Sequence, residues 1–162
     1  MYNFIFDSDA LIKLVYSGAL INVCENFNCI ITSEIKKETV DEGKKRFYPD
    51  AELIEKLIEN KLLKIKNQNK NVEPIKNLGK GELSILSLSK EVKNHIIISD
   101  DGTFIKRLEK EDINFLVPTD LIVLLKRLSK INQKEANDYL ERIKMFIKEE
   151  NYKKIKKELE EE

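Results

Sequence analysis

Short apolar runs alternate with stretches of helical periodicity along most of this chain. The runs are rich in Ile and Phe and end at polar residues, a pattern that predicts β-strands. Between the runs, apolar residues recur at the spacing of a helix face. Strands are predicted at Tyr2–Phe6, Cys29–Ile31, Ile96–Ser99 and Phe115–Val117, and Leu62–Ile65 is a candidate fifth.

Several of the predicted helices begin at residues that commonly cap helices. Ser33, Asp50 and Thr119 each stand just before apolar periodicity, and we expect them to be N-caps. Gly18 marks the end of the first helix. The helices are expected at Leu11–Val15, Ala19–Phe27, Ser33–Glu42, Asp50–Ile58, Gly81–Leu88, Phe104–Leu108, Thr119–Leu128 and Gln133–Lys148.

Strands that alternate with helices predict an α/β fold with a parallel sheet covered by helices on both faces. We expect residues 1–118 to form this sandwich, with 4–5 strands, and residues 119–162 to form a helical C-terminal extension packed on the same domain. Lys and Glu blocks alternate from Tyr152 to Glu162, which is typical of a solvated helix or a frayed tail.

Composition and charge limit the classes of protein. The chain has 162 residues, 29 basic and 29 acidic side chains and no net charge, which argues against a uniformly basic coat for nucleic acid. It has no apolar stretch of membrane-spanning length and no basic, secretory type of N-terminus. Two cysteines are too few for a disulfide framework or a zinc site of their own. We therefore expect a cytoplasmic protein without membrane segments.

Aspartates stand in pairs where two predicted strands end. Asp7 and Asp9 follow the first strand, and Asp100 and Asp101 follow the strand at Ile96–Ser99. Parallel sheets place ligand sites beyond the carboxyl ends of strands. Clustered carboxylates repel one another unless a divalent cation neutralises them, and ligands that are all oxygen favour Mg²⁺ or Mn²⁺. The alternative is that these aspartates cap the helices that follow.

Four segments in order resemble the motifs of the PIN domain, the nuclease fold of VapC-like toxins. Residues 4–12 (FIFDSDALI) are similar to its opening strand, Asp and apolar helix. Residues 30–40 (IITSEIKKETV) are similar to its second acidic helix, residues 78–85 (LGKGELSI) to its Gly-Glu element, and residues 99–101 (SDD) to its last acidic step. The resemblance implies a three-layer α/β/α sandwich.

The resemblance also implies roles for individual residues. The catalytic acids would be Asp7, Glu38, Glu82 and Asp101, and these with Asp100 would be the metal ligands for Mg²⁺ or Mn²⁺. Glu34 remains an alternative to Glu38, because Glu34, Glu38 and Glu42 form one i, i+4, i+8 stripe. The remaining residues that would orient substrate or water are Ser8, Ser99 and Lys80.

The activity implied by the resemblance is hydrolysis of RNA phosphodiester bonds by a metal-dependent endoribonuclease. A VapC-like toxin would have an antitoxin protein as partner, and a housekeeping RNA-processing nuclease is the other interpretation. Dimers are common in the family, and Leu121–Leu128 and Gln133–Lys148 offer apolar faces for a homodimer.

Two other functions fit part of the pattern. A haloacid-dehalogenase-like phosphatase would use Asp7, Asp9 and the later Asp pair with Mg²⁺, but it leaves Glu38 and Glu82 without a role. A catalytically inactive PIN scaffold would bind RNA or protein and would not need all four acids.

An RNA substrate requires positive charge outside the acidic centre. From Asn60 to Lys80 the chain has six Lys against one Glu, and further lysines near the site motifs are Lys13, Lys36, Lys37 and Lys106. Aromatic side chains that stack on bases are sparse. The candidates are Tyr16, Phe47, Tyr48 and Phe104, and we expect packing to be the role of each.

Overall fold

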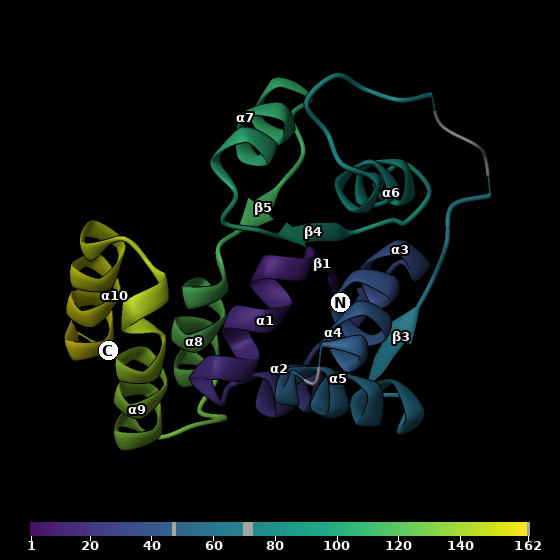
Figure 1. Ribbon diagram of the computed structural model, residues 1–162. Helices are drawn as coiled ribbons and strands as arrows, with labels where there is room; N and C mark the ends of the chain where they lie inside the picture. The colour runs from purple at the N-terminus through teal and green to yellow at the C-terminus, as the bar shows by residue number, and fades with distance from the viewer. Residues whose placement is uncertain (47, 70–72, 162) are drawn as a thin grey trace.

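The computed structural model describes residues 1–46, 48–69 and 73–161. Within them, five parallel strands form one sheet in the order β3-β2-β1-β4-β5, which confirms the predicted α/β class (Figure 1). The strands are β1 (Asn3–Phe6), β2 (Asn28–Ile31), β3 (Leu63–Ile65), β4 (His95–Ile98) and β5 (Phe115–Leu116).

Helices cover both faces of this sheet, as the three-layer prediction requires. Figure 1 shows α6 and α7 on one face and α1 and α2 on the other. The helical elements are α1 (Ser8–Ser17), α2 (Leu20–Asn26), α3 (Ser33–Lys36), the π-helical turn η1 (Lys37–Asp41), α4 (Glu42–Lys45), α5 (Pro49–Glu59), α6 (Lys80–Ser89), α7 (Gly102–Lys110), α8 (Pro118–Arg127), α9 (Gln133–Ile143), the 3-10 turn η2 (Lys144–Phe146) and α10 (Glu149–Glu161).

The central strands β1 and β4 each begin with one polar, partly buried residue and are apolar from there to their carboxyl ends, where both faces of the sheet are covered. Phe4, Ile5 and Phe6 of β1 are almost fully inaccessible, and Ile97 and Ile98 of β4 are equally buried. A strand covered on both faces has no solvated side, so its sequence does not alternate between apolar and polar residues. In the part of the chain that the structure describes, no helix is both long and apolar enough to cross a bilayer.

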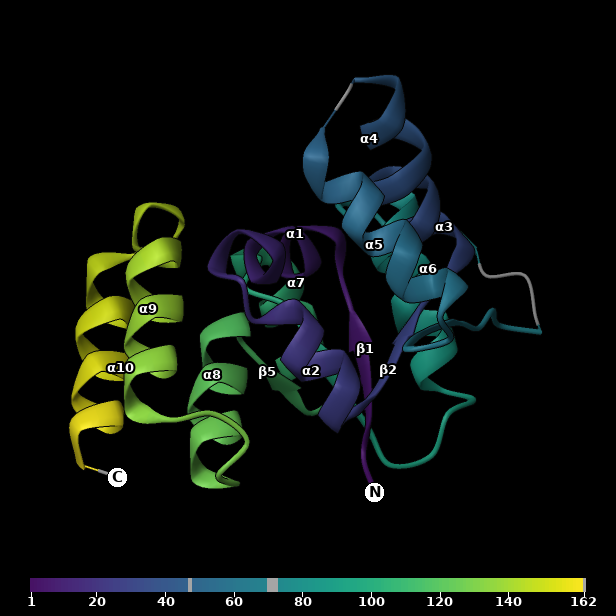
Figure 2. The same ribbon diagram turned by 90° about the horizontal axis from the view of Figure 1, so that it is seen from below.

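The C-terminal helices α8, α9 and α10 pack on one another beside α1 (Figures 1 and 2). Helix α10 continues to Glu161 and buries Tyr152, Ile155 and Leu159. These three residues recur at the spacing of one helix face, so the Lys- and Glu-rich sequence between them forms the solvated side. The segment is therefore a helix packed along one face.

Two predicted helix starts are wrong by a residue or two. Thr32, not Ser33, is the N-cap of α3, because its hydroxyl accepts a hydrogen bond from the backbone N–H of Ile35 at 3.2 Å. Helix α5 begins at Pro49, which suits the first helical position, and Asp50 lies buried in its first turn.

Two predictions near the C-terminus are also wrong in their boundaries. Helix α8 begins at Pro118 with Val117 as its N-cap, so Thr119 lies inside the helix. The helix predicted to reach Lys148 ends at Ile143. A 3-10 turn and an extended Ile147 follow it, and they turn the chain back so that α10 packs against α9.

Candidate active site

The site lies at the switch point of the sheet, where successive strands stop being added on one side of β1 and continue on the other side. From β1 the chain continues to β2 and β3 on one side, and it then returns to β4 on the other side of β1. Phe6 of β1 is paired with Ile98 of β4, so Asp7 and Ser99 leave the sheet next to each other. The backbone N–H of Asp7 donates to the carbonyl of Ile98 at 3.1 Å. Such a switch point is the usual place for a ligand crevice.

Asp7 and Asp101 both cap helices. Oδ1 of Asp7 accepts from the N–H of Ala10 at the start of α1, and Oδ1 of Asp101 accepts from the N–H of Phe104 at the start of α7, both at 2.8 Å. The capping interpretation of these two residues is thus correct. Because each cap uses one oxygen, it also fixes the orientation of the carboxylate and leaves its other oxygen for a ligand.

Glu38 reaches the same place from the π-helical turn η1. Its carboxylate accepts a hydrogen bond from the hydroxyl of Ser8. It also lies against the backbone of Gly81, where an added Cβ would be 2.5 Å from Oε1 of Glu38. The π-turns of helices occur frequently at functional sites. Glu34 does not line the cavity described below, whereas Glu38 does.

Glu82 enters from the first turn of α6. Its Oε2 accepts from the N–H of Gly79 at 3.4 Å, as in a capping box in which the N-cap has no side chain. Gly79 and Gly81 lie on either side of Lys80, so this short Gly-rich turn brings the backbone close to Glu38 and Glu82. The Gly-Glu element therefore positions one acid and makes room for another.

The four predicted catalytic acids, Asp7, Glu38, Glu82 and Asp101, line one cavity of about 160 Å³. They come from the ends of β1 and β4, from η1 and from α6. The other residues that line it are Ser8, Asp9, Ile35, Gly79 and Gly81.

Burial raises the pKa of Asp7 to about 7 from its ordinary value of 3.8. Hydrogen bonds from Ser99 and from the N–H of Ala10 lower it, while the charges of Asp100 and Asp9 raise it further. Asp7 is only 5% exposed, so water does little to screen these charges. Without a cation, the protonated form of Asp7 therefore persists to neutral pH.

The pKa of Glu82 is raised as well. Burial is the largest cause, followed by the negative charge of Asp101. Glu38 and Asp9 raise it further, and the hydrogen bond from Gly79 opposes the shift. The raised pKa values of Asp7 and Glu82 are the electrostatic property expected where a bound cation would supply missing positive charge.

The structure places three other predicted site residues outside the cavity lining. Asp100 forms an ion pair with Lys13 of α1. Ser99 is fully buried, and its hydroxyl accepts a hydrogen bond from the backbone N–H of Asp101 at 3.2 Å. It therefore fixes the backbone of Asp101 from outside the cavity. Lys80 is the exposed first residue of α6.

Asp9 also lines the cavity, although it was not among the predicted catalytic acids. Its place two residues after Asp7 at a strand exit was the available signal. Of the aromatic candidates, Phe104 is fully buried, as expected for a packing residue, whereas Tyr16 and Tyr48 are about half exposed. Phe47 lies outside the described residues.

The donor set suits a hard divalent cation, since its charged ligands are all carboxylates. Among the described residues, however, no group of three or more His, Cys, Asp or Glu side chains is already arranged as a complete set of ligands. The chemistry of the residues therefore fits Mg²⁺ or Mn²⁺, and the acids line the cavity without converging on one point.

The fold and the site define a doubly wound α/β protein with an acidic cavity at its switch point, an arrangement that suits chemistry on phosphate groups. Comparison with protein families is consistent with this class: a family model described as a PIN domain matches residues 3–161. The chain belongs to the PIN domain family. No curated protein is detectably similar to it.

Family membership indicates the broad class of activity. PIN domains are generally nucleases that act on nucleic acids and typically use divalent metals. The haloacid-dehalogenase-like alternative is set aside, because the family model covers nearly the whole chain and because Glu38 and Glu82 share the cavity with Asp7.

The Lys13–Asp100 ion pair gives a first prediction. Replacing Lys13 with Ala leaves the carboxylate of Asp100, which is only 16% exposed, without its partner. We expect this change to lower the free energy of unfolding by about 1–2 kcal/mol, between the values for exposed and buried pairs. Chemical denaturation measures it.

A double-mutant cycle provides the control for this prediction. Asp100→Asn in the Lys13→Ala background should restore most of the loss, because no unpaired charge remains. Lys37→Ala, at an exposed position of η1, should leave stability unchanged. Equal losses for Lys13→Ala and Lys37→Ala would contradict the assignment.

Proposed function

We propose that this protein is an endoribonuclease that hydrolyses phosphodiester bonds of RNA with Mg²⁺ or Mn²⁺ held by the carboxylates of the cavity. The observation that supports it most strongly is that Asp7, Glu38, Glu82 and Asp101, from four separate segments, line one cavity at the switch point of a PIN domain. The pKa values of Asp7 and Glu82 are raised, and these clustered acids need a cation to approach a phosphate, since carboxylates alone would repel it.

The residues of the site form two groups. The first group would hold the cation, and the second group orients the residues of the first. Asp7, Asp101 and Glu82 would hold it, and Glu38 would bind directly or through water. A bound divalent cation activates a water molecule and offsets the charge that builds on the phosphate.

Supporting residues fix these acids before any substrate arrives. The backbone N–H groups at the starts of α1 and α7 orient Asp7 and Asp101, and Ser8 orients Glu38. Ser99 lies between the two aspartates and hydrogen bonds with both. Asp100 forms an ion pair with Lys13. We therefore assign Asp100 the role of holding the Lys13 ammonium group next to the site, and not the role of a main ligand of the metal ion.

The biological role that we propose is that of a cytoplasmic toxin whose antitoxin partner covers the acidic cavity. An RNA-processing nuclease would use the same site. Apolar residues of α8 and α9, such as Leu121, Leu125 and Leu140, are buried within the chain. The two helices therefore do not by themselves argue for a homodimer.

Cleavage of RNA tests the proposed function directly. Purified protein should cut single-stranded RNA when Mg²⁺ or Mn²⁺ is present and should stop when EDTA removes the cation, as gel electrophoresis of labelled RNA would show. Absence of cleavage with both metals would refute the proposal, and cleavage that persists in EDTA would refute its metal dependence. RNA binding without cleavage would support the inactive scaffold instead.

A further inference from the structure

Two aromatic side chains from distant parts of the chain stack on one another at the surface. The rings of Tyr16 in α1 and Phe146 in η2 have centroids 4.9 Å apart and an interplanar angle of 24°. Tyr16 is 50% exposed and Phe146 is 43% exposed, and Met145, which precedes Phe146 in the chain, is 88% exposed. Large apolar side chains gathered at one exposed place indicate a binding surface.

This aromatic pair lies on the same side of the molecule as the acidic cavity. Asp9, Lys13 and Tyr16 follow one another along a single face of α1, at i, i+4 and i+7. Asp9 lines the cavity, and Tyr16 is about 10 Å farther along the helix at ~1.5 Å per residue. Figure 2 likewise shows the turn between α9 and α10 on the side where β1 ends.

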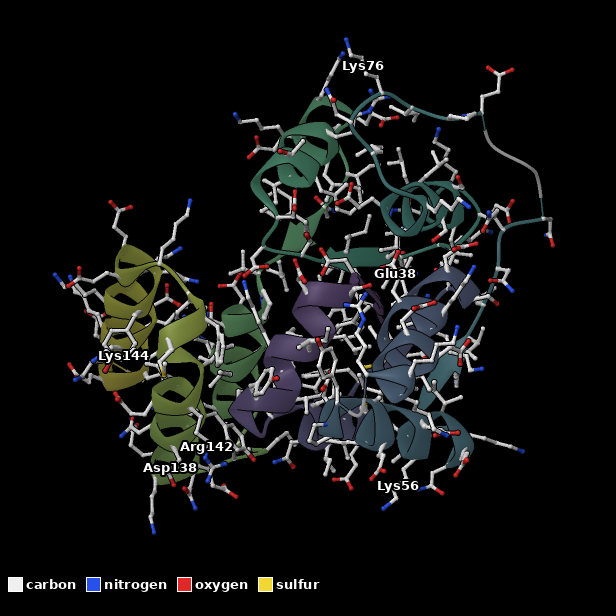
Figure 3. All side chains as sticks on the ribbon, viewed as in Figure 1. Glu38, Lys56, Lys76, Asp138, Arg142 and Lys144 are labelled. Carbon is white, nitrogen blue, oxygen red and sulfur yellow. The ribbon has the colours of Figure 1, made fainter. Side chains whose placement is uncertain are left out.

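Basic residues lie close to Phe146 in the sequence. The segment from Arg142 to Lys148 contains three basic residues, and the acids Glu141 and Glu149 flank it. Nζ of Lys144 lies over the ring of Tyr152 in α10, so Arg142 is the basic residue of this segment nearest to α1. The guanidinium of Arg142 lies beside the end of α1, where an added Cβ on Gly18 would be 2.6 Å from its Nη1. Figure 3 shows Arg142 and Lys144 among the side chains of this C-terminal part of the molecule.

We propose that Tyr16 and Phe146 form a stacking platform for an unpaired nucleobase of the RNA substrate. Aromatic rings beside basic side chains are the usual means of binding single-stranded nucleic acid. At ~3.4 Å per stacked nucleotide, the 10 Å or so from the cavity places this base within about three nucleotides of the bond that is cut. The proposal rests on the proposed function, and it names the part of the substrate that the platform holds.

A second copy of this chain is the competing occupant of the surface. In a two-fold dimer the same patch would face itself, which would bring the Arg142 side chains of both copies close together. Like charges at such a contact oppose association. The guanidinium of Arg142 beside the end of α1 therefore favours RNA, which carries the opposite charge.

Binding of a short single-stranded RNA tests the platform without requiring cleavage. We would measure it by fluorescence anisotropy in the Asp7→Asn background with Mg²⁺ present. Tyr16→Ala and Phe146→Ala should each weaken binding by about 5- to 100-fold, the range for loss of one base–aromatic stack. Tyr16→Phe keeps the ring and should bind within about twofold of the parent.

Matched controls separate stacking from other effects. Tyr2 is 57% exposed and precedes β1, so it lies at the amino ends of the strands, whereas the cavity lies at their carboxyl ends. Tyr2→Ala should therefore not change the affinity for RNA. RNAs with one abasic nucleotide, scanned along the strand, should lose the Tyr16→Ala effect at one position. Unchanged affinity in both alanine variants would overturn the platform, as would a weakening that is equal for every abasic RNA.

Two further measurements distinguish the remaining outcomes. A dimer by light scattering that Tyr16→Ala converts to a monomer would assign the surface to a second copy and overturn the proposal. If the wild-type protein binds RNA through Tyr16 but never cuts it, the proposed activity fails and the platform stands. If it cuts RNA and no variant changes affinity, the platform alone fails.

Discussion

Replacing Asp7 with Asn should abolish RNA cleavage and at the same time make the folded protein more stable above pH 7. Asn keeps an oxygen that accepts the capping hydrogen bond from Ala10, so α1 keeps its N-cap. The substitution removes the negative charge of Asp7 that would hold the cation. Because a bound metal supplies several kcal/mol of transition-state stabilisation, cleavage should fall at least ~10²-fold.

The stability gain follows from the raised pKa of Asp7. The pKa is about 7 in the folded protein and 3.8 for a solvated carboxyl, so the folded state binds the proton more tightly. The contribution of Asp7 to the free energy of unfolding is therefore greatest below about pH 4, falls as pH rises, and is lowest above about pH 7. Asn does not titrate and is free of this loss.

Denaturation curves between pH 4 and pH 9 in EDTA measure the effect. Asp7→Asn should match or fall below wild type near pH 4 and exceed it at pH 8 by about 1–4 kcal/mol, the upper limit being three pKa units at ~1.4 kcal/mol each. Asp138→Asn, at an exposed position of α9, is the control and should follow wild type throughout. A difference for Asp7→Asn that does not vary with pH would contradict this origin of the shift.

The sequence was sufficient for those site residues that follow directly from strand ends. Asp7 stands immediately after an apolar run and Asp101 three residues after one, and parallel strands bring their carboxyl ends to the same side of the sheet, so strand prediction places the two residues near each other. The same local signals failed at helix starts. By residue type Ser33 is as good a cap as Thr32, and Thr119 is a better cap than Val117, so only backbone geometry decides which position takes the role.

Other parts of the site depend on structure that no local pattern encodes. The π-turn that carries Glu38 breaks the i, i+4 spacing, so the stripe of Glu34, Glu38 and Glu42 did not identify which glutamate enters the cavity. The partner of Asp100 is Lys13, which is 87 positions away in the chain. Contacts at such separations arise from the packing of whole elements, and helical or strand periodicity carries no information about them.

Gly81→Ala should reduce RNA cleavage by about 10- to 100-fold without destabilising the protein. A Cβ at this position would stand 2.5 Å from Oε1 and 3.0 Å from Cδ of Glu38. The carboxylate is the free end of a flexible side chain, so it moves aside at little cost in stability. It then leaves the hydroxyl of Ser8 and its place in the cavity. Displacements of about 1 Å can cost ~10²-fold in rate.

Stability should stay the same or rise, because Ala forms helix more readily than Gly by about 1 kcal/mol in a helix interior. This separates the effect from misfolding. Gly102→Ala is the matched control: Gly102 is the first residue of α7, and an added Cβ there meets no atom within 4 Å. We expect it to preserve both cleavage and the free energy of unfolding.

A double-mutant cycle with Glu38 tests whether the lost activity arises from that side chain. In the Glu38→Ala background nothing remains for the new methyl group to displace, so Gly81→Ala should cause no further loss of cleavage rate. Additive losses in the double variant would instead mean that Gly81 acts through its backbone alone. Non-additivity would place Glu38, and not Glu34, among the acids that the reaction needs, which sequence spacing left open.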